Sequence, residues 1–167
     1  MPLDQATGTL QDTAALWSID AVSPQAVVSW ACDALIAGLD SPSLRVLAGL
    51  TRAEADYYAL DILPAALAEL GLDIYPRDSR SGQEAAARAL AAQAVSGSLS
   101  PRELAAAIHR HFGHSLPLTE RLAALDDEYD LGAYATMTHE QIDQEVIAEA
   151  RRLTNGQPDQ QTTRNDQ

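Results

Sequence analysis

The sequence predicts an all-α protein, a compact irregular array of six to eight helices, some of them short, with no sheet. Helix-initiating motifs recur along the chain, and glycines follow most of the predicted helices. No run of four to eight residues alternates with β-branched or aromatic enrichment, as a strand would. Aromatic residues are only 5% of the 167 residues, so we expect a core of aliphatic side chains between closely spaced helices.

The expected domain organisation is a single helical domain over residues 12–155. Residues 1–11 are predicted to be a flexible N-terminus, and a first short helix is expected over 14–19. Residues 156–167 are polar and hold no large apolar side chain, so the sequence predicts a disordered tail there. The length suits one domain that needs neither disulfides nor metals to build a core.

Local motifs predict where most helices begin and end. Serine followed by proline begins a helix because serine caps the first turn and proline is tolerated at its first position. Capping boxes satisfy two backbone donors at once, and glycine suits the position after a helix. The Ser-Pro starts are Ser23-Pro24, Ser41-Pro42 and Ser100-Pro101; the capping boxes begin at Thr51, Ser100 and Thr138; the glycine ends are Gly38, Gly49, Gly71, Gly97 and Gly113.

Three segments depart from this regular pattern of helix starts and ends. Pro64 lies inside the helix that begins after Thr51, so we expect a kink or break near Ile62. A loop over 72–80 precedes an Ala-rich helix over about 83–95. A short helix is predicted over 118–125, and the acidic run from Asp126 to Asp130 is expected to follow it as a solvated loop.

Three stretches resemble a group of small bacterial proteins rich in Ala and Leu. With a closing acidic segment and last helix, the likeness covers roughly residues 25–153. The shared motifs are mostly capping and packing residues, so the resemblance implies an all-helical fold, and it transfers no catalytic residue. The stretches are Asp40-Ser41-Pro42-x-Leu44-Arg45-x-Leu47-Ala48-Gly49-Leu50, Leu63-Pro64-x-x-Leu67-x-Glu69-Leu70-Gly71 and Ser96-Gly97-x-Leu99-Ser100-Pro101.

The net charge of −13 restricts the expected partners. All eleven basic residues are Arg, and residues 114–155 hold nine acidic residues against three Arg. Such a charge argues against nucleic acid or an anionic membrane surface, and it permits a basic protein partner. The residues expected to contact that partner are Asp126, Asp127, Glu128, Asp130, Glu140 and Asp143.

The single cysteine and the N-terminal residues indicate the cellular location of the protein. Cys32 is the only cysteine, so no intrachain disulfide can form, and we expect it to be a small packing residue. The first ten residues lack the basic and apolar runs of a signal peptide, and no stretch has about 20 apolar residues. We therefore expect a cytoplasmic protein.

The histidines are the best candidates for chemistry. His109 and His111 are two positions apart on a helix and point roughly 200° away from each other. His111 and His114 can converge only if the helix ends at Gly113. Because a tight site needs three or four convergent ligands, no metal or cofactor ligand is assigned, and the histidines are expected to lie at the helix C-terminus, where positive charge is favourable.

Other motifs fail on spacing. The acidic run from Asp126 has Leu131 and Met137 where a calcium-binding loop needs Gly and Glu, and His139-Glu140 lacks the second His of a zinc-protease motif. No nucleophile elbow, phosphate loop or dinucleotide turn occurs, so no catalytic residue is assigned and an enzyme is not favoured.

We therefore expect a small acidic interaction protein, such as an immunity protein or antitoxin that inhibits a basic partner. Two alternatives stay open. One is a small-molecule-binding or enzymatic helical domain that uses the region of His109, His111 and His114. The other is a structural subunit of a homo-oligomer.

Overall fold

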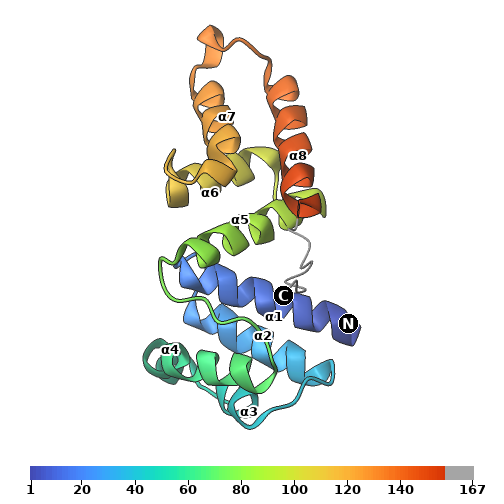
Figure 1. Ribbon diagram of the computed structural model, residues 1–167, viewed down its shortest axis with the longest axis vertical. Helices are drawn as coiled ribbons and strands as arrows, with labels where there is room; N and C mark the ends of the chain where they lie inside the picture. The colour runs from blue at the N-terminus through green and yellow to red at the C-terminus, as the bar shows by residue number, and fades with distance from the viewer. Residues whose placement is uncertain (157–167) are drawn as a thin grey trace, which may run out of the picture. The chain divides into compact units, whose positions relative to one another are not determined.

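The computed structural model describes residues 1–156, and residues 157–167, most of the predicted tail, lie outside the described part. Within residues 1–156 the chain forms eight α-helices and two short 3-10 helices and no strand, which confirms the all-α prediction (Figure 1). None of these helices combines the length and apolar character needed to cross a membrane.

The chain divides into two compact units, Met1–Ala89 and Leu90–Gln167, and the boundary falls inside helix α5 (Arg80–Val95). The sequence predicts one domain over 12–155 because 167 residues is a usual length for a single domain. That single domain stays a prediction.

The first unit contains α1 (Leu3–Ser18), α2 (Pro24–Ile36), α3 (Pro42–Ala48) and α4 (Arg52–Glu69). Helix α2 packs against α1, α3 and α4, and α3 packs against α4. The core is aliphatic, as the composition predicts, and its small alanines let the helices approach closely. Its members are Leu10, Ala14, Val27, Ala31, Ala34, Leu44, Leu47, Ala59, Leu63, Ala66 and Leu67.

Helix α1 begins earlier in the chain than the sequence predicts. The sequence predicts a flexible terminus over 1–11, yet the helix begins at Leu3. Ala6 and Leu10 lie on one face and are 1% exposed, so tertiary burial stabilises a segment whose local propensity is weak. Thr7, Gly8 and Thr9 are poor helix formers, so local propensity does not predict the helix.

The predicted capping motifs form as expected. The side chains of Ser23 and Ser41 accept hydrogen bonds from the third following backbone N–H. All three capping boxes are present, at Thr51, Ser100 and Thr138. A kink or a break is expected near Ile62, and helix α4 runs through Pro64 as one helix, so there is no break.

The second unit contains α6 (Pro101–Phe112), η1 (Pro117–Thr119), α7 (Glu120–Asp130), η2 (Gly132–Tyr134) and α8 (His139–Asn155). Helix α6 packs against α7 and α8, which also pack against each other and are joined through η2 (Figure 1). The predicted apolar faces of α6 and α8 are buried. The largest fully buried side chains in this unit are Leu104, Ile108, Leu122, Leu125, Ile142, Val146 and Leu153.

Helix α7 corrects the prediction of a loop at the acidic run. The helix continues from Glu120 to Asp130, because Leu122, Leu125 and Tyr129 recur at helical spacing and are buried together on one face. The acidic residues between them therefore have fixed directions on a helix and are not part of a solvated loop.

Two glycine substitutions are expected to change stability in opposite directions. Gly8 lies inside α1 with open space around a new Cβ, so Gly8→Ala should raise the free energy of unfolding by roughly 0.5–1 kcal/mol. Gly113 has φ +53° after α6, so Gly113→Ala should lower it by roughly 1–3 kcal/mol. Urea unfolding followed by circular dichroism measures both changes, and a gain in stability from Gly113→Ala would contradict the strained turn.

Candidate functional site

A turn at Gly113 brings two histidines together at the end of α6. Gly113 has φ 53° and ψ −137°, a backbone conformation that side chains with a Cβ rarely adopt. After this turn the ring of His114 lies edge-on to the ring of His109, with the centroids 5.1 Å apart. His111 is the partner of His114 that the sequence suggests, and the structure pairs His114 with His109.

Helix α7 supplies carboxylates to this histidine pair. Nδ1 of His109 lies 2.9 Å from Oδ2 of Asp126 and 3.7 Å from Oδ1 of Asp127. Because an ionised carboxylate only accepts hydrogen bonds, Nδ1 of His109 is the donor to Asp126. Two residues of the acidic run thus face the histidine region, a contact between two segments that the sequence analysis treated separately.

His114 is held between two carboxylates. Its Nδ1 lies 3.0 Å from Oε1 of Glu120, and its Nε2 lies 3.2 Å from Oδ2 of Asp127. The hydrogen bond with Glu120, together with the negative charges of Glu120 and Asp127, raises the pKa of His114 above its ordinary value, although partial desolvation opposes the shift. We name the group His109, His114, Glu120, Asp126 and Asp127 the histidine–carboxylate cluster.

The chemistry open to this cluster is proton transfer or cation binding. Nitrogen or oxygen atoms of His109, His114 and Asp127 all lie within 4.8 Å of one another. His111 lies outside this group, with its ring 6.2 Å from that of Phe112. The sequence feature behind the pair is a glycine that separates a histidine inside the helix from a histidine just beyond the helix end. This feature predicts the pairing only when the φ of Gly113 is known.

A second polar group joins the three helices of this unit. Tyr129 on α7 is 3% exposed, and its hydroxyl donates a hydrogen bond to Asp143 on α8. The guanidinium of Arg102 on α6 lies 5.1 Å from the centre of the Tyr129 ring, a cation–π distance. Burial and the adjacent Asp143 carboxylate raise the pKa of Tyr129, so the phenol stays protonated as a donor.

The six residues predicted to contact a partner have different environments. Asp126 and Asp127 face the histidines, and Asp143 accepts from Tyr129. Glu128 accepts from the backbone N–H of Thr136 at 3.2 Å, and Asp130 lies 4.0 Å from Arg102. Glu140 is exposed at the start of α8 and shares a groove with Asp143.

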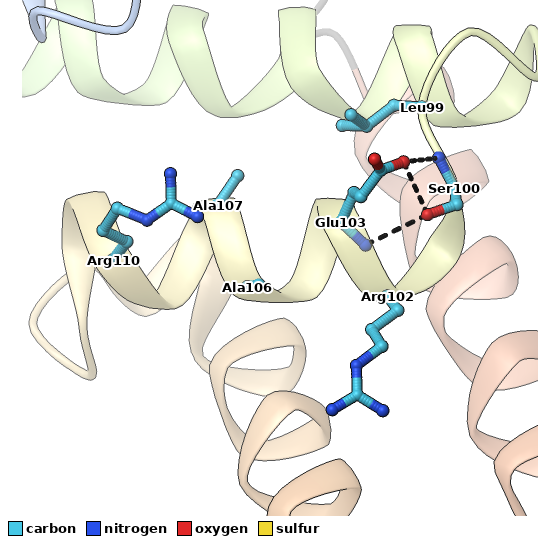
Figure 2. A pocket seen from close by; sticks show the side chains of 7 residues that line it. All are labelled: Leu99, Ser100, Arg102, Glu103, Ala106, Ala107 and Arg110. Atoms are coloured by element: carbon cyan, nitrogen blue, oxygen red, sulfur yellow. Dashed lines mark hydrogen bonds between the residues drawn. The ribbon is translucent and has the colours of Figure 1, made fainter.

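One surface groove that borders α6 is lined by Ala106, His109, Arg110 and Asp126. Two others contain no histidine. The larger, about 550 Å³, is lined by Leu99, Ser100, Arg102, Glu103, Ala106, Ala107 and Arg110. Figure 2 shows that Ser100 and Glu103 form hydrogen bonds with each other in the capping box and that Arg102 and Arg110 point apart. The hydrogen bonds from Ser100 lower the pKa of Glu103. The smaller, about 370 Å³, is the α8 groove, lined by Pro101, Glu140, Asp143, Gln144, Ile147 and Arg151.

The pKa of His114 gives a prediction with a definite sign. A histidine whose pKa is raised by folding adds stability below its unfolded pKa, about 6.5, and this contribution is lost as pH rises through the folded pKa. Glu120→Gln should therefore lower the His114 pKa measured by NMR titration, and its loss of stability should be largest below pH 6.5. An unchanged His114 pKa in this variant would contradict the assigned cause.

Removal of the Tyr129 hydroxyl should weaken the contact between α7 and α8. Tyr129→Phe is expected to lower the free energy of unfolding by about 0.5–1.5 kcal/mol, the usual net contribution of one hydrogen bond. The matched control is Tyr134→Phe, because Tyr134 is 89% exposed and the same change there should be neutral. Equal effects in the two variants, measured by urea unfolding, would refute the role of the hydroxyl.

Comparison with known proteins adds no family assignment. No protein-family model matches the chain, and no curated protein or solved structure matches it either.

Proposed function

We propose that this chain is a small interaction protein that binds a basic protein partner through the α8 groove. The observation that carries the proposal is the groove itself, in which Glu140 and Asp143 stand one helical turn or less apart beside the apolar side chain of Ile147. Two of the six residues expected from the sequence thus share one concave surface.

The lining of the groove suits an arginine or lysine side chain. Ile147 offers apolar contact to the aliphatic stem of such a side chain, while the carboxylates of Glu140 and Asp143 face its cationic end. Tyr129 donates a hydrogen bond to Asp143 and so holds this carboxylate in a fixed orientation. Arg151 also lines the groove, and its positive charge disfavours a second cationic side chain of the partner next to Arg151. The partner therefore has one preferred orientation in the groove.

The charge of the surrounding segment supports the same partner class. Residues 114–155 carry nine acidic residues and three Arg, so a basic protein is attracted over distances longer than direct contact. An inhibitor of the immunity or antitoxin kind is the version we favour, because an acidic chain can mask a basic functional surface. The association should weaken as salt concentration rises.

Affinity measurements on matched charge variants test the proposal. The partner is isolated from the native cell with the wild-type chain and identified, and its binding is then measured by calorimetry. Glu140→Gln should reduce affinity roughly tenfold or more, as loss of one member of an interfacial charge pair does. Asp61→Asn removes the same charge from an exposed position on α4 and should leave affinity unchanged.

Several outcomes would overturn the proposal. They are a partner that is neutral or acidic, equal losses from Glu140→Gln and Asp61→Asn, and binding that does not respond to salt. Inhibition is tested separately, by adding the chain to the partner's own activity assay.

A second candidate function has its own observation. The histidine–carboxylate cluster supports the alternative of a small-molecule-binding or enzymatic domain, because it joins two imidazoles to three carboxylates in the same unit. Ligand screening by thermal shift distinguishes the two candidates, since a shift that is lost in His114→Gln and kept in Glu140→Gln would favour this one.

A further inference from the structure

We propose that His109, His114 and Asp127 form a binding site for a divalent transition-metal ion of the zinc class. The proposal does not depend on partner binding by the α8 groove. It rests on the convergence of two imidazoles and one carboxylate whose ligand atoms lie within 4.8 Å of one another.

The distances are close to those that a bound ion requires. Bonds of about 2.0–2.1 Å arranged as a tetrahedron put neighbouring ligand atoms roughly 3.3–3.5 Å apart. Oδ2 of Asp127 is 3.2 Å from Nε2 of His114, and Oδ1 of the same carboxylate is 3.7 Å from Nδ1 of His109. These two contacts use different oxygens of Asp127, so the ion would draw the three ligand atoms, now within 4.8 Å of one another, closer together.

A second observation points to a ligand, because the ring of His114 is already oriented. Its Nδ1 donates to Glu120 and its Nε2 faces Asp127, so in the protonated ring Nε2 donates to Asp127 and releases this proton to solvent when it binds the ion. Histidines that bind metals commonly donate their other N–H to a carboxylate in this way, which fixes the tautomer and increases the basicity of the ligand.

Asp126 lies beside the three proposed ligands. Its Oδ2 lies 2.9 Å from Nδ1 of His109, so the carboxylate borders the position that the ion would occupy. Metal binding replaces the proton on Nδ1 of His109, and that proton is released to solvent. Asp126 then changes from hydrogen-bond acceptor to a neighbour of the ion, where its charge compensates the cation.

The donor set selects the kind of metal. Imidazole nitrogen favours Zn²⁺, Ni²⁺ and Cu²⁺, whereas Ca²⁺ and Mg²⁺ prefer sites built wholly from oxygen. The side chains of His114 and Asp127 are 47% and 52% exposed, so the ion is accessible from solvent. Three protein ligands leave a coordination position for water, as in zinc sites that are open to further ligands.

Calorimetric titration with zinc chloride tests the site. The sample is the full chain, purified without a histidine tag. Wild-type protein should bind one Zn²⁺ per chain, and His114→Gln and Asp127→Asn should each weaken binding at least about tenfold. Glu120→Gln should weaken it roughly 10-fold to 100-fold, the usual effect of losing an orienting carboxylate. Calcium and magnesium chloride should give no comparable heat.

The matched controls are His111→Gln and His139→Gln, which remove histidines outside the group. They should bind zinc as the wild type does. Nitrogen-15 NMR of the unmodified protein adds a readout that needs no variant, because zinc should shift Nδ1 of His109 and Nε2 of His114 most strongly. Absence of stoichiometric binding by the wild type, equal losses in the control variants, or ring-nitrogen shifts at other histidines would each overturn the proposal.

Discussion

The second unit depends on the register of α7 against its neighbouring helices. Leu122, Leu125 and Tyr129 bury one face of α7, and this burial extends the helix through the acidic run. A buried aliphatic or aromatic side chain contributes about 1.5–3 kcal/mol, which exceeds the cost of placing a few acidic residues near a helix C-terminus. Once the register is fixed, Asp126 and Asp127 must face the end of α6.

The negative charges on α7 lie close to basic side chains of neighbouring segments. Acidic residues in the last turns of a helix are disfavoured by the partial negative charge of its free carbonyl groups. Here His109 faces Asp126, His114 faces Asp127, and Arg102 lies 4.0 Å from Asp130. The same arrangement that relieves this repulsion gathers imidazoles and carboxylates at one place, so stability and the candidate chemistry have a common electrostatic origin.

Features that depend on contacts between residues close in the sequence were predicted correctly, and features that depend on packing between helices were missed. Starts at Ser23, Ser41 and Ser100 were predictable because a cap joins residues only three positions apart. Helix α1 and the second half of α7 were missed, because burial against other helices stabilises them and their own sequence is weakly helical or strongly charged. The pairing of His109 with His114 was missed for a related reason, since it requires a turn whose direction depends on backbone angles at Gly113.

By itself, the sequence determined the all-α class, most helix boundaries and the excess of negative charge, all of which depend on composition or on contacts within one helical turn. Only the tertiary structure decided which charged residues meet. Asp126 and Asp127 approach His109 and His114 because α6 and α7 pack through buried apolar faces. Glu140 and Asp143 are neighbours on α8 itself, and the packing of α8 against α6 adds Pro101 to their groove. Neighbours on adjacent helices are set by the register of packed side chains, and no local pattern in the sequence encodes that register.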